Sequence, residues 1–337
     1  FEEIDYEIEA KNAEKFSLLF RENPKITIPR VERLFSSRKV ITTSWIEGTK
    51  LKSREELIKN SLNPSEIIKT GVTSAIQQLL EFGYFHADPH PGNMFAMKED
   101  AKEKGPLAYV DFGMMDEISE EDRLTLTGAI VHLINKDFTS LAFDFQKLGF
   151  LSKEKDPTPI APVLEEVLGG SLGEEVINFN FKSITDKFSE LMFDYPFRVP
   201  PRFALIIRAV VSQEGLALKL DPEFKIIGVA YPYVAKRLIT GETDELVDIL
   251  LDIIFDKNGN LNLERIENLL QVISKDINNQ SSDLFEISKA GFKLLISKTG
   301  KTLRKNLILT VIKDNEIKTD DLRNLIRILR KTFTFDK

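Results

Sequence analysis

The stretch YFHADPHPGNMF, residues 84–95, places two histidines, an aspartate and an asparagine around two prolines and a glycine. His86, Asp88 and Asn93 fit the spacing H-x-D-x-x-x-x-N, and Asp111 opens an Asp-Phe-Gly triplet after a second apolar run. Phosphoryl transfer from ATP needs a carboxylate that orients the attacking hydroxyl, and oxygen ligands that hold Mg²⁺ against the phosphates. Asp88, Asn93 and Asp111 offer those groups, so the pattern predicts one divalent-ion site beside a nucleotide.

The same residues are also compatible with a plain turn or with a different metal site. Asp, Asn, Pro and Gly all favour turns for backbone reasons, so each residue taken alone is accounted for as a turn former. His86, Asp88 and His90 form an alternative metal set, although a proline-stiffened backbone suits a closed zinc site poorly and a third strong ligand is missing. The order of the whole set, after a helix and across a hairpin, favours the nucleotide site.

The elements that must position these residues are readable from periodicity. Apolar residues at helical spacing predict a helix from Asp5 to Phe20. Two β-rich runs, Val31 to Phe35 and Lys39 to Trp45, predict a pair of strands. Asn63-Pro64 is a good helix start, and Gly83 is the matching stop, so a second helix delivers the chain into the motif.

After the motif, the runs NMFAM and LAYV, separated by KEDAKEKGP, predict a hairpin with a solvated tip. Ser119 to Asp122 match a capping box for a helix through about Leu133. The segment RVPPRFALIIRAVVSQEGLALKL reads as a proline-started buried helix. The remaining chain is almost wholly helical in pattern. These elements predict an α+β chain dominated by helices.

Composition limits the function classes. The 337 residues are 42% hydrophobic, with a net charge of −7 and a pI near 5.3, which argues against nucleic acid as a partner. Cysteine is absent, which excludes disulfides, thiolate zinc sites and cysteine nucleophiles. No apolar run approaches the about 20 residues that cross a bilayer, so we expect any membrane contact to be peripheral and the location to be cytoplasmic or organelle-interior.

Four segments carry a resemblance to a known family. EEIDYEIEAKNAEKF, VITTSWIEG, FHADPHPGN and VDFGM, in this order, resemble the UbiB family of atypical kinases, also called ADCK or aarF-domain kinases. The match runs from about residue 1 to residue 240. It implies a protein-kinase-like fold that uses ATP and Mg²⁺ and supports isoprenoid-quinone biosynthesis or lipid homeostasis. It also implies a lipid or quinone precursor as a partner, with ATP hydrolysis better attested than protein phosphorylation.

The resemblance assigns roles position by position. Asp88 corresponds to the catalytic-loop aspartate, in a motif where His86 supports the loop, and Asn93 and Asp111 correspond to the Mg²⁺ ligands. Glu9 corresponds to the helix glutamate that pairs with the ATP-binding lysine.

The resemblance also assigns roles in binding the nucleotide to two further elements. Glu3 and Asp5 correspond to the family's E-x-D element, which contacts an N-terminal lysine-glutamine motif. The stretch TSWIEG falls where the family's hinge passes the adenine, which makes the backbone groups of Ser44 and Ile46 candidates for hydrogen bonds to the base.

The chain also departs from the family. The lysine-glutamine motif, the alanine-rich nucleotide loop and the strand lysine lie upstream of Phe1 in the family, and none is found here. We therefore expect a fragment that is inactive alone, with an N-lobe remnant at 1–48, a kinase-like C-lobe at 49–240 and a helical extension at 241–337. The alternatives are a phosphotransferase of the aminoglycoside or choline kinase type, and a non-catalytic lipid-binding scaffold.

Overall fold

The computed structural model describes residues 5–98, 105–169, 197–241, 243–256, 259–277, 289, 293–294, 296–298, 300–313, 316–317, 323–324 and 327. The chain divides into two compact units. Unit 1 combines Phe1–Leu126 with Phe138–Ala230, and unit 2 combines Thr127–Asp137 with Tyr231–Lys337.

Two small sheets form the β part of unit 1. The first has the order β1-β5-β4-β2, where β1 pairs parallel with β5 and the other pairs are antiparallel. The second pairs β3 and β6 antiparallel. The strands are β1 (Ile26–Thr27), β2 (Thr49–Lys50), β3 (Tyr84–His86), β4 (Met94–Ala96), β5 (Leu107–Tyr109) and β6 (Met115–Glu117). The predicted hairpin is therefore confirmed as β4–β5.

Helices supply most of the remaining structure. Unit 1 holds α1 (Tyr6–Leu19), α2 (Arg54–Lys59), α3 (Pro64–Gln77), α5 (Phe138–Lys147), α6 (Ala161–Leu164) and α9 (Pro201–Leu220). Helices α4 (Glu120–Ile134) and α10 (Ile226–Thr240) each contribute residues to both units, and unit 2 adds α11 (Asp244–Ile254), α12 (Leu263–Ile277), α14 (Lys301–Val311), β7 (Ile312–Lys313) and β8 (Glu316–Ile317). This composition confirms the predicted α+β class.

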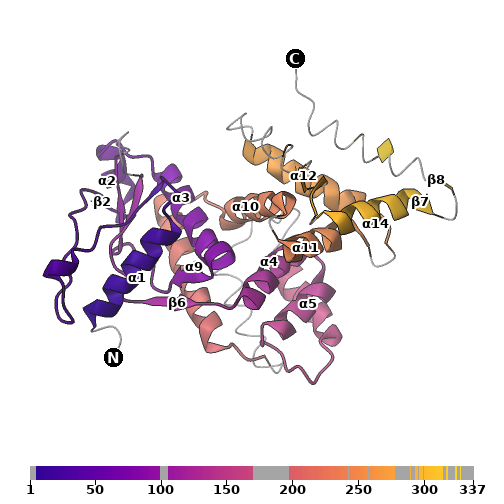
Figure 1. Cartoon of the computed structure of the whole chain (residues 1–337), viewed down its shortest axis with the longest axis horizontal. Helices are drawn as coiled ribbons and strands as arrows, with labels where there is room; N and C mark the ends of the chain where they lie inside the picture. Colours follow the sequence, from indigo (N-terminus) through magenta and orange to yellow (C-terminus); the bar gives the residue numbers. More distant parts are fainter. Residues whose placement is uncertain are drawn as a thin grey trace, which may run out of the picture. The chain divides into compact units, whose positions relative to one another are not determined.

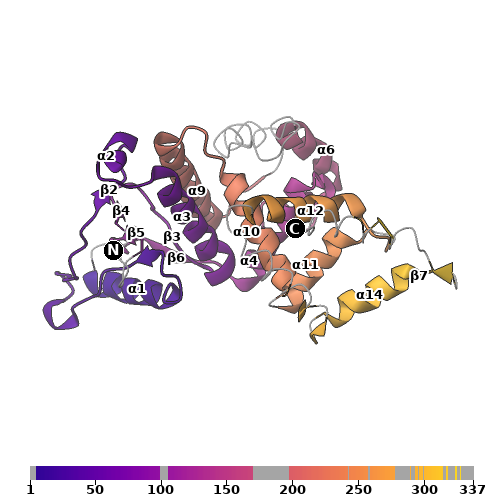
Figure 2. The ribbon, with the colours of Figure 1, turned by 90° about the horizontal axis from the view of Figure 1, so that it is seen from above.

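Helix α1 packs on the sheets through one apolar stripe. Asp5 caps the helix by accepting the N–H of Glu7 at 3.1 Å. The Phe16 ring is fully buried and lies 5.4 Å from the ring of Tyr109 and 5.3 Å from that of Phe112, measured between centroids. Figure 2 shows the strands of unit 1 between α1 on one side and the neighbouring helices α3 and α9 on the other.

Helix α3 leads directly into the motif. Asn63 caps it and Pro64 occupies its first turn, as the sequence predicts. A π-helical turn, Gln78–Phe82, extends it to Gly83, whose φ of +66° turns the chain into β3. Along its length α3 packs against α9 (Figure 1). The helix predicted from the capping box at Ser119 is also confirmed, as α4.

The strands predicted for residues 31–45 are wrong. Arg33–Phe35 form a 3₁₀ turn, and the only pairing in this segment is the isolated bridges Val31–Thr43 and Ser37–Val40. The side chain of Thr42 donates to the carbonyl of Phe35 at 2.7 Å. Hydroxyl groups that bond to nearby backbone in this way compete with a regular ladder.

Unit 2 contains a largely buried ion pair. Arg265 on α12 donates to the carboxylate of Asp137 at 2.9 Å, and both side chains are less than a quarter exposed. Thr243 caps α11 by accepting the N–H of Leu246. Within the described residues of both units, none of the helices combines the length and the hydropathy that a bilayer crossing requires.

Candidate active site

Two loops of unit 1 are bonded to each other at both ends. Residues 87–93 connect β3 to β4, and residues 110–114 connect β5 to β6. At one end the N–H of Val110 donates to the carbonyl of Asn93 at 3.1 Å, and at the other the N–H of Ala87 donates to the carbonyl of Met114 at 2.9 Å. The loops therefore run side by side, and they bring Asp88, Asn93 and Asp111 to one end of the paired strands.

The first loop carries one buried and one accessible oxygen group. Asn93 is 8% exposed, and its Nδ2 donates weakly to the carbonyl of Asp88 at 3.4 Å. This bond leaves the amide oxygen of Asn93 as a free acceptor. The side chain of Asp88 is 38% exposed, so its carboxylate can meet a substrate from solvent.

The second loop faces Glu9 of α1. Oε1 of Glu9 accepts the N–H of Phe112 at 3.4 Å, and Oδ1 of Asp111 accepts the N–H of Gly113 at 3.0 Å. A Cβ added to Gly113 would lie 3.4 Å from Oδ1 of Asp111 and 3.9 Å from Oε2 of Glu9. Burial and then the charge of Asp111 raise the pKa of Glu9, against the opposing effect of the Phe112 N–H.

The two acids lack a cation in the described part of the chain. No described lysine or arginine forms an ion pair with Glu9, and no three described His, Asp or Glu side chains converge on a metal site. Hard oxygen donors on Asp111 and Asn93 nevertheless suit Mg²⁺, which is usually held by one or two side chains together with phosphate and water oxygens. The residues present therefore fit a nucleotide-bound Mg²⁺.

His86 supports the first loop through a hydrogen bond to its backbone. Its ring is buried, and Nδ1 accepts the backbone N–H of Asp88 at 3.1 Å. Burial lowers the pKa of His86, although the charges of Asp111 and Asp88 oppose that shift. The ring is therefore neutral at physiological pH. Because Nδ1 already accepts the hydrogen bond from the backbone N–H of Asp88, this geometry does not favour the metal set of His86, Asp88 and His90.

Sequence reasoning missed two residues that brace the loops. Gln78 lies fully buried in the π-helical turn and accepts the N–H of His86 at 2.9 Å. Asn12 on α1 donates to the carbonyl of Phe112 at 2.9 Å and accepts the hydroxyl of Tyr84 at 3.0 Å. Asn12 lies three residues after Glu9, so the two side chains share one face of the helix. This spacing could have indicated Asn12 from the sequence.

The residues predicted to contact the nucleotide from outside the two loops are not all gathered at the site. Glu3 lies outside the described residues. Asp5 caps α1 and pairs with Arg38 at 3.1 Å. It therefore holds the start of the helix and does not join the two loops.

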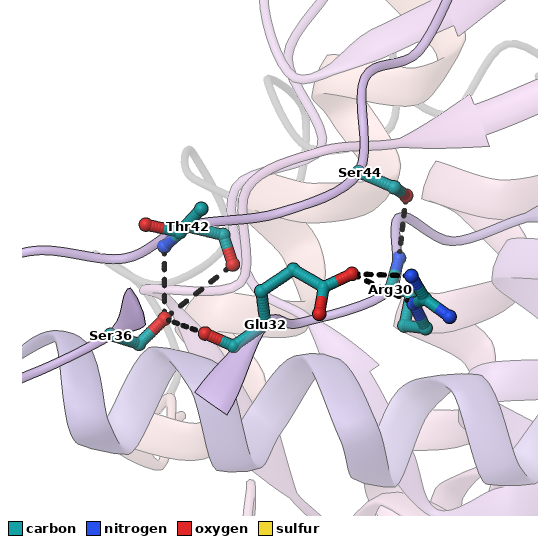
Figure 3. Close-up of polar contacts among 5 residues, drawn as sticks. All are labelled: Arg30, Glu32, Ser36, Thr42 and Ser44. Carbon is teal, nitrogen blue, oxygen red and sulfur yellow. Dashed lines mark hydrogen bonds and ion pairs between the residues drawn. The ribbon is translucent and has the colours of Figure 1, made fainter. Parts of the chain in front are cut away.

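The segment around Ser44 is held by its own polar contacts (Figure 3). The Ser44 N–H donates to the carbonyl of Arg30 at 2.8 Å, and its Oγ accepts the N–H of Arg30 at 2.9 Å. Nearby, Oγ of Ser36 accepts the N–H of Thr42 and donates to the carbonyl of Glu32. The backbone N–H of Ser44 is thus engaged, which leaves its carbonyl and the backbone of Ile46 for a base.

Comparison with known proteins identifies the family. Residues 1–144 match the ABC1 atypical kinase-like domain. An uncharacterized protein of Synechocystis is 47% identical over 99% of this chain and 57% of its own length. The chain belongs to the UbiB family of ABC1 atypical kinases. The resemblance seen in the sequence is confirmed, and the chain has a kinase-like fold.

The chain is also similar to plant members of the family. ACTIVITY OF BC1 COMPLEX KINASE 1 and 3 of Arabidopsis thaliana, both chloroplastic, are 37% and 40% identical over 97% and 94% of this chain. The chain spans 49% and 43% of their lengths, so it covers about half of the curated relatives that it matches. A solved structure of a Mycobacterium tuberculosis protein with erythromycin is 22% identical over 65% of this chain, with a TM-score of 0.46, and the chain covers 55% of that protein.

Proposed function

We propose that this UbiB-family chain provides the catalytic loop and the metal-binding residues of a Mg-ATP-dependent kinase or ATPase. The observation that supports this proposal is the pairing of the two loops, which gathers Asp88, Asn93 and Asp111 at one end of the β4–β5 hairpin. These groups are the ones that phosphoryl transfer needs, because positioning and charge neutralisation supply most of its catalysis.

In this proposal each side chain has a separate task. Asp88 orients a hydroxyl or water by accepting its proton in a hydrogen bond, and neutral His86 holds the backbone of Asp88 in place. Asn93 and Asp111 would hold Mg²⁺, which when bound neutralises the charge of the phosphates. The carbonyl of Ser44 and the backbone of Ile46 face the adenine, and Glu9 receives a cationic partner near the phosphates.

The biological setting of the proposal comes from the resemblance. We infer a role in isoprenoid-quinone biosynthesis or lipid homeostasis, with a lipid or quinone precursor as the partner and contact with a membrane at its surface. The chloroplastic relatives support an organelle interior as the location. We further propose that residues 1–48 are part of an N-lobe, 49–240 the C-lobe and 241–337 a helical extension.

A second candidate is a scaffold that binds without turnover. It is favoured by Glu9, whose half-buried carboxylate has a raised pKa and no described ion-pair partner. A kinase of this kind uses that glutamate to hold the lysine that contacts the α- and β-phosphates. Without such a cation, the chain would retain the metal-binding half of a site and lose the ability to orient ATP.

The test compares Mg-dependent ATP turnover by the chain, alone and together with the regions that flank it in its gene. We expect Asp88→Asn or Asp111→Asn to lower turnover by at least about 100-fold. Asp248→Asn, an exposed aspartate on α11, is the matched control and should have no effect. Equal turnover in the wild type and in both site variants would reject the kinase proposal and favour the scaffold.

A further inference from the structure

The first loop contains a second histidine that has no role in the mechanism proposed so far. The backbone N–H of His90 donates to the carbonyl of Asp88 at 2.8 Å, and its carbonyl accepts the N–H of Asn93 at 2.9 Å. His90 therefore forms the turn that joins the predicted catalytic aspartate to the predicted metal ligand. Its side chain is 47% exposed, so neither burial nor core packing explains its position.

The orientation of the His90 ring is set by Gly92. The N–H of Gly92 donates to Nδ1 of the ring at 2.9 Å. A Cβ on residue 92 would lie 2.5 Å from Cε1 and 2.8 Å from Nδ1, so only glycine leaves space for the ring in this place. The sequence His-Pro-Gly-Asn thus packs an exposed imidazole against bare backbone.

This contact decides which nitrogen carries the proton. Because Nδ1 accepts a hydrogen bond, the neutral ring must carry its proton on Nε2. Nε2 faces Oδ2 of Asp88 at 3.8 Å. That distance is too long for a hydrogen bond, but catalytic hydrogen bonds in ligand-free enzymes are often long and shorten in the substrate complex.

We propose that His90 is a positioning residue for Asp88. In the substrate complex its Nε2–H donates to Oδ2 of Asp88, which fixes the carboxylate and leaves Oδ1 for the acceptor hydroxyl or water. The two histidines then act on different parts of one residue, since His86 holds the backbone N–H of Asp88 and His90 holds its carboxylate. His90 takes no proton from the reaction. This inference rests on the proposed function.

Two substitutions separate the two nitrogens of the ring. In His90→Asn the side-chain oxygen replaces Nδ1 and can still accept the N–H of Gly92, but no donor reaches Asp88. In His90→Gln the side-chain nitrogen replaces Nε2 and can still donate to Asp88, but the bond to Gly92 is lost. Both variants should fold normally because the side chain is half exposed, and circular dichroism with thermal melting checks this.

The experiment measures steady-state ATP turnover by the chain with its flanking regions. We expect His90→Asn to lower kcat about 10- to 100-fold with KM for ATP nearly unchanged, since a misplaced catalytic group costs rate and not binding. His90→Gln should recover most of that loss. The inference is overturned if His90→Asn keeps the wild-type kcat, or if Gln is no better than Asn.

Two further measurements separate this inference from the proposed function. Nitrogen NMR of the wild-type chain should show the ring of His90 protonated on Nε2 at neutral pH, and the Nδ1–H tautomer would overturn the inference whatever the activity. If Asp88→Asn abolishes turnover while His90→Asn does not, the inference fails and the proposed function stands. If Asp88→Asn has no effect on turnover, the proposed function fails and the inference fails with it.

Discussion

At the scale of single residues, the surroundings of two glutamates on α1 shift their pKa values in opposite directions. Burial and the charge of Asp111 raise the pKa of Glu9 above its usual value of 4.5. The guanidinium of Arg33, which donates to both oxygens of Glu14, lowers the pKa of that carboxyl. The charge of Glu9 thus destabilises the fold and the charge of Glu14 supports it, which is the pattern expected when one acid is kept for function.

We predict opposite effects of Glu9→Gln and Glu14→Gln on the melting temperature at pH 7. A raised folded pKa means that ionised Glu9 lowers stability above that pKa, so Glu9→Gln should raise the midpoint by about 1–2 °C. The gain should vanish below pH 4.5, where Glu9 is protonated in both states.

Glu14→Gln is the matched control on the same helix. It should lower the midpoint slightly, and its loss should shrink as the pH falls through the lowered pKa of Glu14. Thermal melts between about pH 3 and pH 8 measure both variants. A fall in stability on Glu9→Gln at neutral pH would show that the carboxylate already has a favourable partner.

At the scale of elements, the position of the motif depends on how α3 ends. The π-helical turn ends at Phe82, and Gly83 joins it directly to β3. The carbonyl of Gly83 accepts the N–H of Ile118, which ties β3 to the start of α4. A left-handed residue at this point therefore sets the direction in which His86 and the first loop leave the helix.

Two glycine-to-alanine substitutions should change the free energy of unfolding in opposite directions. At Gly83 the φ of +66° and a carbonyl 3.0 Å from the added Cβ should make Gly83→Ala cost about 1–2 kcal/mol of unfolding free energy. At exposed Gly215 on α9, nothing lies within 4 Å of the added Cβ, so Gly215→Ala should gain up to about 1 kcal/mol. Urea denaturation measures both, and equal effects would contradict this account of the α3 terminus.

At the scale of the whole molecule, the two units are interleaved along the chain. Residues 127–137, from the second half of α4 and the turn after it, belong to unit 2 together with residues from Tyr231 onward. Asp137 in this segment pairs with Arg265 on α12. The helical extension proposed to begin at residue 241 thus shares its unit with a segment from the middle of the sequence.

A chain cut after residue 240 should therefore lose stability in the part that remains, and not only its tail. Residues 127–137 would lose the part of unit 2 that lies beyond residue 240, including the ion-pair partner Arg265 on α12. We expect a broader unfolding transition and new binding of a hydrophobic dye by the cut chain. Asp137→Asn in the full chain removes the carboxylate that pairs with Arg265 and should cost less than the cut. A sharp transition at the original midpoint would show that residues 241–337 fold independently.

Local features of the fold could be predicted because their causes lie close together in the sequence. The cap at Asn63, the glycine at residue 83 and the helical spacing of apolar residues all act within a few positions. The segment at 31–45 was predicted wrongly because its β-rich composition is the same for strands and for a turn held by hydroxyl groups.

The sequence by itself determined the residue types and spacing of the candidate site, and through them the family. The tertiary structure alone decided that Asn12 and Gln78 brace the loops, that Asp5 stays at the helix start, and that the His90 ring faces Asp88. These contacts join residues through distances and orientations that a spacing does not encode. Spacing along a chain is a covalent property, whereas the direction of a side chain depends on every element packed against it.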